Sequence, residues 1–274
     1  MKRKLWKFYT RLLLFYCFMT AFTKGDNARY YYWSFDEGEF NGIGETPAIS
    51  GEDASNEIQL SSSDIVSGKS LNFSTNYYID LTTRRDECLL SPDLCVNGHT
   101  YCLWVKTLQN TSGWHYYFTN GGNIEDSKGV SFYHFNGDLV IKLSDGSFYY
   151  FLYHSIDFNK FWNHYCWTWN TSSPIELFIN GTSATKSTSK QSKNVSTSKT
   201  FPLRFGANCE YSHPSIYNHY YASSLFDEFW FWEVQKSKEF VLNAFQLTLE
   251  FINQGMLIQS SVMLFIINNP PHKQ

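Results

Sequence analysis

Two cysteines of this chain each lie inside a short run of aromatic and β-branched residues. Cys166 lies within His164–Thr171 (HYCWTWNT), and Cys102 lies within Tyr101–Val105 (YCLWV). Short runs of this composition are typical of buried strands. The sequence therefore predicts two core strands that each carry a cysteine, and this constrains the fold more than any other feature of the chain.

The composition agrees with a strand-rich domain. Aromatic residues make up 19% of the 274 residues, and aromatic side chains favour strands over helices. Charged residues make up only 17%, with a formal net charge of −3. Because there is no excess of positive charge, we do not expect nucleic acid to be a partner. The length fits one large domain or two small ones.

The first 23 residues have the pattern of a secretory signal. A basic stretch that includes Lys2–Lys4 precedes the apolar run Leu12–Phe22, and polar residues follow it. The apolar run is much shorter than the roughly 20 residues needed to cross a bilayer, which favours a cleaved signal over a retained membrane anchor. We therefore expect a secreted, extracellular protein.

Secretion gives the cysteine count a meaning. Of the six cysteines, Cys17 lies inside the signal, so five remain in the mature chain. An oxidising compartment favours disulfides, and without a CxxC pair no structural zinc site is expected. Because five is odd, one thiol is expected to be free or to pair with a second chain.

Five Asn-x-Ser/Thr motifs agree with export. We expect N-glycans on these asparagines, which should lie on exposed loops and turns. They are Asn72, Asn110, Asn170, Asn180 and Asn194.

The region from Gly25 to about Phe245 is predicted to be one all-β domain. Tight hairpin turns are expected at Asn136-Gly137, Asp145-Gly146 and Asn180-Gly181, because these dipeptides suit positive backbone φ angles. The strands are expected at residues 30–35, 70–73, 77–81, 100–107, 130–135, 138–143, 147–153, 174–179, 203–206 and 225–234.

Three segments are expected to differ from this pattern. Ser183–Thr200 is almost entirely Ser, Thr and Lys and is predicted to be a mobile loop. Glu239–Phe251 is predicted to be a helix, with an apolar stripe that includes Phe240 and Ala244. The apolar tail after Gly255 is too short to span a membrane alone, and we expect a loosely docked or poorly ordered tail rather than an anchor.

The cysteine runs resemble a known family. The spacing His164-x-Cys166-x-Thr168-Trp169-x-Thr171 resembles the pentraxin signature. More broadly, residues 28–245 resemble a concanavalin A-like, laminin G-like domain, with landmarks at 33–36, 68–73, 162–164, 177–181 and 226–232. The resemblance implies an all-β, two-sheet antiparallel jelly-roll sandwich over residues 24–245. Residues 246–274 would then hold the end of a short helix and the tail.

The resemblance also implies disulfides. It pairs Cys102 with Cys166, and it favours a short loop closed by Cys88 and Cys95. The alternative is that Cys88 or Cys95 pairs with Cys209. The favoured pairing leaves Cys209 unpaired, so a dimer through that thiol is a further hypothesis.

Pentraxins bind calcium, and by resemblance Asp126, Asn208 and Glu210 could supply ligands. Calcium needs 6 to 8 oxygen ligands, usually with several carboxylates. Here Cys209 interrupts the cluster, and the following loop Tyr217–Tyr221 has no carboxylate. Solvated acidic loops are therefore the preferred interpretation, with a degenerate single calcium site as the alternative.

Glucanases share this architecture, so an enzyme has to be considered. They need two carboxylates roughly 5 to 9.5 Å apart. Neither Asp36–Glu39 nor Asp227-Glu228 repeats the spacing of the hydrolases, and we expect no catalytic activity. His164 is expected to be structural, because an oxidised Cys166 is not a nucleophile.

The remaining interpretation is a secreted, non-enzymatic recognition module. By resemblance its ligand is an extracellular glycan, a glycoconjugate or a matrix protein. Tyr and Trp offer an apolar ring face with a polar tip, and the candidates for stacking on sugars are Trp114, Tyr116, Tyr217 and Tyr220. The alternatives are a protein–protein adhesion or assembly domain and, less favoured, a glucanase-like hydrolase.

Overall fold

The structure is a computed structural model of the whole chain. It describes residues 28–35, 43–44, 59–61, 70–73, 78–82, 87–108, 113–156, 160–194, 197–209 and 221–254. Several predictions fall outside these residues. They concern the signal, the tail after Gly255, Asp36–Glu39, Asn110, Glu210, Tyr217 and Tyr220.

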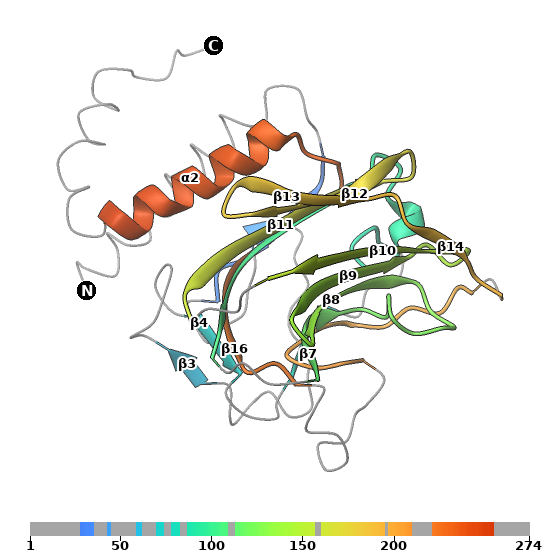
Figure 1. The fold of residues 1–274 in the computed structure, drawn as a ribbon, viewed down its shortest axis with the longest axis horizontal. Coiled ribbons are helices and arrows are strands. Elements are labelled where there is room, and N and C mark those ends of the chain that lie inside the picture. Colours follow the sequence, from blue (N-terminus) through green and yellow to red (C-terminus); the bar gives the residue numbers. More distant parts are fainter. Residues whose placement is uncertain are drawn as a thin grey trace.

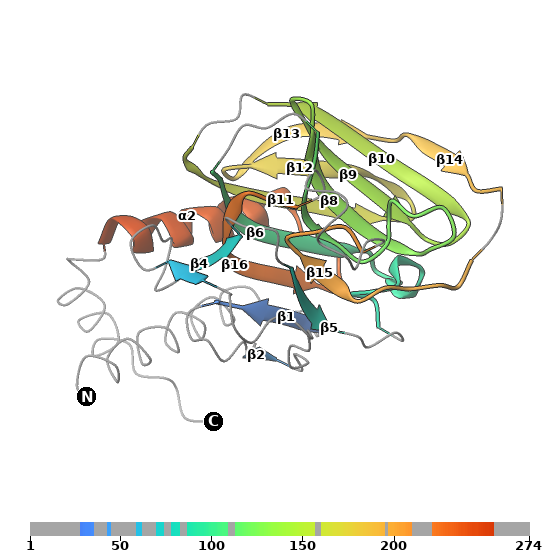
Figure 2. The ribbon, with the colours of Figure 1, turned by 90° about the horizontal axis from the view of Figure 1, so that it is seen from below.

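The described strands form two antiparallel sheets that pack face to face, which confirms the predicted jelly-roll sandwich (Figures 1 and 2). The nine-stranded sheet has the order β13 (Thr182–Ser187), β12 (Ser173–Ile179), β11 (Trp162–Asn170), β6 (His99–Thr107), β16 (Ser224–Trp232), β1 (Tyr30–Trp33) and β2 (Ile43–Gly44), with β4 (Ser70–Phe73) beside β16 and β3 (Gln59–Ser61) beside β4. The seven-stranded sheet has the order β14 (Lys190–Ser192), β10 (Phe148–Ser155), β9 (Asp138–Ser144), β8 (Gly129–Phe135), β7 (Trp114–Thr119), β15 (Leu203–Phe205) and β5 (Ile79–Thr82).

The core between the sheets is dominated by aromatic rings. Trp167 is fully buried, and its ring centroid lies 4.9 Å from Tyr101, 4.9 Å from Phe132 and 5.5 Å from Phe118. The first of these rings comes from the same sheet as Trp167 and the other two from the opposite sheet. The aromatic run around Cys166 therefore joins the two layers.

The two predicted disulfides are both present. Cys102 and Cys166 lie directly opposite each other on β6 and β11, and their sulfurs are bonded. Cys88 and Cys95 are bonded around the short 3₁₀ helix η1 (Pro92–Leu94). Cys209 is the free cysteine among the described residues.

Two of the three predicted tight turns are confirmed. Asn136 and Gly137 have φ values of 49° and 97°, and Asn180 and Gly181 have φ values of 51° and 75°. The prediction for Asp145-Gly146 is wrong in length, because residues 145–147 separate β9 from β10. There the Asp145 carboxylate accepts backbone N–H bonds from Ser147 at 2.9 Å and Phe148 at 2.7 Å, which stabilises the longer turn.

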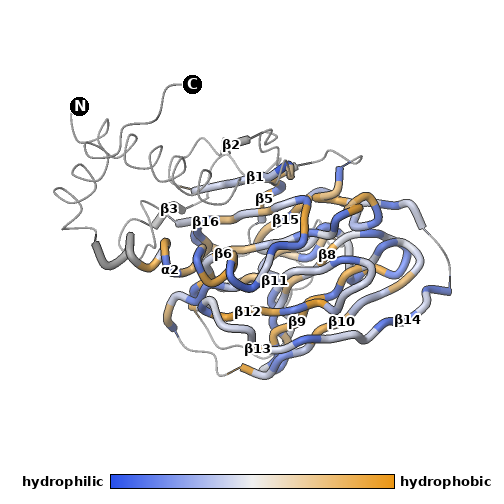
Figure 3. The backbone as a smooth tube through the Cα atoms, turned by 90° about the horizontal axis from the view of Figure 1, so that it is seen from above, coloured by the Kyte–Doolittle hydropathy of each residue, from blue (hydrophilic) through white to orange (hydrophobic). Residues whose placement is uncertain are grey.

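The prediction of a mobile loop over Ser183–Thr200 is also wrong in part. Thr182–Ser187 forms β13 at the edge of one sheet, and Lys190–Ser192 forms β14 at the edge of the other. Backbone hydrogen bonds to β12 and β10 hold these strands, so they need few apolar side chains. Lysines on edge strands also discourage pairing with other chains. The hydrophilic colour of β14 marks this edge in Figure 3.

A C-terminal helix covers the outer face of the nine-stranded sheet. Helix α2 (Lys238–Gln254) buries Phe240, Val241 and Ala244 against that face, where Trp232 lies 5.1 Å from the Phe240 ring (Figure 1). The predicted stripe is thus confirmed for Phe240 and Ala244. Among the described residues no helix has the length and apolarity needed to cross a membrane.

Three buried histidines predict an acid-sensitive fold. Burial lowers the pKa of His99 and His164 to about 3 and that of His134 to about 4, from 6.5. Below about pH 6.5 the unfolded chain therefore binds protons that the folded chain does not, so the free energy of unfolding falls as the pH decreases towards 4.

The variant that tests this prediction is His99→Phe, which replaces the imidazole by a ring that does not titrate. The His99 ring has no hydrogen-bond partner to lose and packs against Tyr101 and Trp169. Urea unfolding measured between pH 7.5 and pH 4 should show a shallower pH dependence for this variant. An unchanged pH dependence would mean that His99 is not a source of the acid sensitivity.

Candidate functional site

The outer face of the seven-stranded sheet carries a second set of aromatic residues. Alternate residues of β7–β10 point away from the core, and within the described chain no helix covers them. We call this surface the outer aromatic face. Its members are Trp114, Tyr116, Tyr133, Phe135, Val140, Lys142, Tyr149, Phe151 and Tyr153.

The strand register arranges these side chains in rows across the sheet. One row runs from Tyr116 through Tyr133 and Val140 to Tyr153. Residues opposite each other on neighbouring strands have Cβ atoms about 5 Å apart, so each row is a continuous strip of side chains. The row spans four strands, but Tyr116, Tyr133 and Val140 are buried in it and only Tyr153 is exposed.

Two rings on this face are open to solvent. Trp114 is 36% exposed, and its ring lies 4.4 Å from Phe135 and 5.8 Å from Tyr133, nearly parallel to the latter. Tyr153, at the β10 end of the row that begins with Tyr116, is 58% exposed. Exposed flat rings held by neighbouring rings are suited to stacking on the apolar face of a sugar. Between them Tyr133 and Val140 are buried, so the two open rings are separate contact points rather than one exposed patch.

Polar groups lie beside the aromatic strip. Asn123, in the loop after β7, donates from Nδ2 to the Tyr116 hydroxyl at 3.0 Å, and its Oδ1 accepts from Ser131 Oγ at 2.6 Å. Thr119 Oγ1 lies 2.6 Å from the same Ser131 Oγ. Thr119, Ser131 and Tyr116 are buried, so this network holds the Tyr116 ring in place beneath the face.

Two lysines also reach this face. Lys142 Nζ lies 4.4 Å from the centre of the Tyr149 ring and 5.4 Å from that of Phe151. Lys193 Nζ lies 4.5 Å from the centre of the same Tyr149 ring. Both ammonium groups therefore make cation–π contacts at the end of the face nearest β14.

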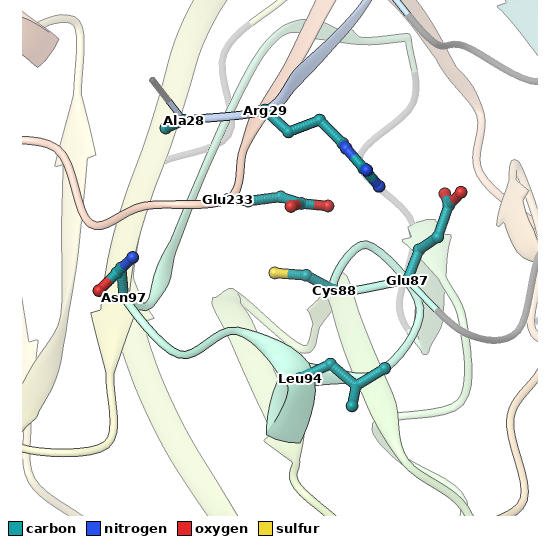
Figure 4. Close-up of a pocket in the computed structure, with 7 residues that line it drawn as sticks. All are labelled: Ala28, Arg29, Glu87, Cys88, Leu94, Asn97 and Glu233. Carbon is teal, nitrogen blue, oxygen red and sulfur yellow. The ribbon is translucent and has the colours of Figure 1, made fainter. Parts of the chain in front are cut away.

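A separate depression lies at the rim of the sandwich (Figure 4). The Arg29 guanidinium and the carboxylates of Glu87 and Glu233 face it. The Tyr31 hydroxyl lies 3.1 Å from Glu87 Oε2 and 3.3 Å from Glu233 Oε1. The Tyr31 hydroxyl therefore bridges the two carboxylates, which one guanidinium, that of Arg29, faces.

The two predicted stacking residues that the structure describes, Trp114 and Tyr116, differ in how exposed they are to solvent. Trp114 is 36% exposed and stays a candidate for stacking, whereas Tyr116 is only 1% exposed, so the Tyr116 ring supports the face rather than contacting a ligand. Sequence reasoning missed Tyr153 and Phe151. The alternation of inward and outward residues in Phe148–Ser155 contains the signal, but aromatic residues occur on both sides of that strand.

The calcium candidates are engaged in other contacts. Asp126 pairs with Lys199 at 3.2 Å, and Asn208 is buried with its backbone carbonyl 3.5 Å from Arg204 Nη1. Among the described residues, the group of metal-capable side chains is Cys102, His164 and Cys166. Both sulfurs of that group are in the disulfide and unable to bind as thiolates. The described residues therefore do not fit a calcium site, and Glu210 lies outside them.

His164 has a structural position. It is buried, its ring packs 5.0 Å from Trp104 and 5.8 Å from Phe245 of α2, and its imidazole lies beside the Cys166 sulfur at 3.6 Å. Burial keeps this imidazole neutral at physiological pH. Its surroundings match a packing role between the sheet and α2.

Cys209 is also buried. Its Sγ lies 3.2 Å from the Thr119 carbonyl oxygen and 3.5 Å from that of Pro202, and burial raises the pKa of its thiol to about 12. A disulfide to a second chain would need this segment to open. The structure therefore disfavours the hypothesis of a dimer linked through Cys209.

The glycosylation motifs differ in how accessible their acceptor nitrogens are. Asn194 is exposed, whereas the Nδ2 atoms of Asn170 and Asn180 donate to Gln235 and Asn163. Asn72 lies in β4 between β3 and β16, so the expectation of an exposed loop is wrong there. Of the four described motifs, Asn194 best fits a modification site.

The second carboxylate candidate of the enzyme hypothesis is held in the sheet. Asp227 is fully buried and accepts the backbone N–H of Glu228 at 2.9 Å. Glu228 adopts a φ of 50° where the pairing of β16 with β6 shifts register, and its carboxylate accepts the Tyr32 hydroxyl. These contacts explain both residues as parts of a β-bulge.

Comparison with known proteins identifies the fold class independently. Residues 73–241 match the family model described as the concanavalin A-like lectin/glucanases superfamily. A search of curated proteins finds no match.

Solved structures with a similar fold include binding domains. The binding domain of Paraclostridial Mosquitocidal Protein 1 aligns with a TM-score of 0.56 at 16% identity, over 80% of this chain and 52% of that one. Domain 4 of AbnA, an extracellular arabinanase from Geobacillus stearothermophilus in complex with arabinotriose, aligns with a TM-score of 0.54 at 17% identity, over 80% of this chain and 98% of that one.

The botulinum neurotoxin serotype D ligand binding domain, in complex with N-acetylneuraminic acid, aligns with a TM-score of 0.53 at 14% identity, over 80% of this chain and 50% of that one. The chain thus spans about half the length of the toxin binding domains it matches. At these identities the likeness establishes the fold alone.

Proposed function

This chain belongs to the concanavalin A-like lectin/glucanase superfamily, and on that basis we propose that it is a secreted, non-enzymatic recognition module that binds extracellular glycans through its outer aromatic face. The ligand would stack its sugar rings on Trp114 and Tyr153, the two rings of this face that are open to solvent. The observation that carries this proposal is the exposed, ring-supported Trp114 on a sheet face that α2 does not cover.

Two of the similar structures contain sugars. One was solved with arabinotriose and another with N-acetylneuraminic acid, so sugar ligands occur among proteins with this fold.

The carboxylates of the described residues favour binding over hydrolysis. A glycosidase needs one carboxylate as an acid and a second as a nucleophile or base on either side of the scissile bond. On the outer aromatic face the one carboxylate within the rows is Asp138, which lies opposite Phe135 and Ser155. The pair Glu87 and Glu233 lies at the rim with Tyr31 and Arg29 between its members.

The proposal is tested by the replacement of Trp114 with alanine. Removing the indole ring removes its stacking contact with the sugar. We therefore expect at least a tenfold loss of affinity, equivalent to about 1.4 kcal/mol. The measurement is binding of the purified protein to a glycan array, followed by titration of the best glycan. The matched control is Phe161→Ala, another exposed aromatic residue, which precedes β11 of the other sheet.

The array is run with and without a chelator. Equal binding in both conditions is expected, because the described calcium candidates are engaged elsewhere. Wild-type protein that binds no glycan in either condition would remove the lectin proposal. Binding that Trp114→Ala and Phe161→Ala leave equally intact would remove the outer aromatic face as its site.

Exposed apolar residues at the rim favour the alternative of a protein–protein assembly domain. Leu94 and Val96 are both exposed, and they line adjoining depressions that share Ala28 and Asn97. A protein ligand would be expected to need these two side chains. Retained binding of a matrix protein after Leu94→Ser and Val96→Ser would reject this rim as the contact.

A further inference from the structure

Two positive charges meet on one ring at the β14 edge of the outer aromatic face. Lys142 comes from β9, and Lys193 follows β14, yet both Nζ atoms lie about 4.5 Å from the centre of the Tyr149 ring, at 4.4 and 4.5 Å. The strands put Tyr149 between them, since β10 lies between β9 and β14. This juxtaposition is created by the sheet and not by the sequence, where the two lysines are 51 positions apart.

Neither lysine forms an ion pair with a described carboxylate. Lys142 Nζ donates to the Asn123 carbonyl oxygen at 3.5 Å, and Lys193 Nζ donates to the Ser127 carbonyl oxygen at 2.7 Å and to Ser144 Oγ at 3.1 Å. In the same region Lys128 pairs with Asp93, and Lys199 with Asp126. Lys190, in β14 itself, also has no ion pair among the described residues, but its Nζ lies over Phe148 and Tyr150, so Lys142 and Lys193 are the pair that shares the Tyr149 ring.

Holding two such charges together is unfavourable without a counter-ion. Burial lowers the pKa of Lys142, and burial followed by the charge of Lys142 lowers the pKa of Lys193. Like charges repel more strongly where water is partly excluded. A bound anion would relieve both effects at once.

The nearby carboxylates either make contacts with other groups or are exposed to solvent. Asp145 accepts two backbone N–H groups and the Tyr150 hydroxyl at 3.1 Å, and Asp126 pairs with Lys199. Glu125 is exposed and acts on both lysines through its charge alone. None of the three lies within ion-pair distance of Lys142 or Lys193.

We propose that Lys142 and Lys193 bind an anionic group, a carboxylate or a sulfate, of the glycan that stacks on the outer aromatic face. This inference rests on the proposed function and narrows its ligand to acidic glycans. Lys142 is two residues from Val140 along β9, so its row lies about 7 Å from the row that ends in Tyr153. One ligand of a few sugar units can therefore reach both the lysines and the exposed rings.

The test compares matched neutral and acidic glycans. Titrations use a neutral oligosaccharide and its sialylated, uronate-containing and sulfated derivatives, with wild-type protein and the variants Lys142→Gln and Lys193→Gln. Wild-type protein should bind at least one acidic derivative at least tenfold more tightly than the neutral parent. Each variant should lose most of that preference, measured as the ratio of its affinities for the acidic derivative and for the neutral parent.

Two further variants sharpen the test. Lys190→Gln is the matched control, because Lys190 Nζ also lies over an aromatic ring, that of Phe148 at 3.7 Å, but points to the core side of β10. It should leave the preference unchanged. Glu125→Gln removes the nearby unpaired negative charge and should strengthen binding of the acidic derivative, more so at low salt.

The outcomes separate the inference from the proposed function. Preference for the carboxylated or for the sulfated derivatives identifies the source of the anion. Equal affinity for neutral and acidic glycans, or a preference that Lys190→Gln lowers as much as Lys142→Gln, overturns the anion site while glycan binding stands. Failure of wild-type protein to bind any glycan overturns both, and thermal unfolding of every variant shows that each is folded.

Discussion

Replacing Cys102 and Cys166 together with alanine is expected to lower the free energy of unfolding by about 4 kcal/mol. The bridge closes a sequence separation of 64 residues, so its removal returns considerable chain entropy to the unfolded state. Its sulfurs also lie in the apolar cluster beneath α2, with Phe178 and Val241. Urea unfolding monitored by tryptophan fluorescence measures the change.

The second disulfide is the matched control. Cys88 and Cys95 are separated by only 7 residues, and in the same chain-entropy model their replacement is expected to cost about 2.5 kcal/mol. The two double variants should therefore differ by more than 1 kcal/mol in the stated order. Equal losses would show that loop closure does not account for the effect of the Cys102–Cys166 bridge.

Replacing Trp167 with alanine is expected to destabilise the fold by about 3–5 kcal/mol. Trp167 is fully buried and contacts aromatic rings of both sheets, so its removal leaves a cavity that neighbouring rigid rings cannot fill. The same urea unfolding experiment applies. If the variant is too unstable to purify, Trp167→Phe should show a smaller loss in the same direction.

Trp114→Ala gives the comparison for a tryptophan on the surface. Trp114 is partly exposed, and its ring contacts are those with Phe135 and Tyr133. We expect the loss of these ring contacts to lower the free energy of unfolding by about 1 kcal/mol or less. Trp114→Ala should therefore impair glycan binding with little effect on the stability of the fold. Trp167→Ala should instead lower that stability strongly. A comparable loss of stability in both variants would contradict the division between core and outer aromatic face.

Local chemistry explains the sequence predictions that are confirmed. Asn136-Gly137 and Asn180-Gly181 form tight turns because their residues tolerate positive φ, and this preference acts over two residues. The aromatic runs around Cys102 and Cys166 form strands for a similarly local reason. The pairing of those cysteines came from a family resemblance, and the register of β6 and β11 confirms it.

The predictions that are wrong depended on contacts with distant residues. Ser183–Thr200 lacks apolar side chains, yet the free edges of β12 and β10 provide backbone partners for β13 and β14. Tyr116 is a residue type that often stacks on sugars. In the structure it is buried, because Asn123 bonds to its hydroxyl and the Tyr133 ring packs beside it.

By itself the sequence determined most of the strands and turns and the cysteines that the jelly roll needs, because these follow from the preferences of short segments, but it did not predict β2, β3, β7, β13 or β14. Only the tertiary structure decided which sheet face α2 covers, which aromatic rings stay open and which charges meet. Lys142 and Lys193 contact the same ring because β10 pairs with both β9 and β14, and strand pairing depends on the whole sheet. A side chain's role on such a face is therefore set by its neighbours across the strands, which are far away in the sequence.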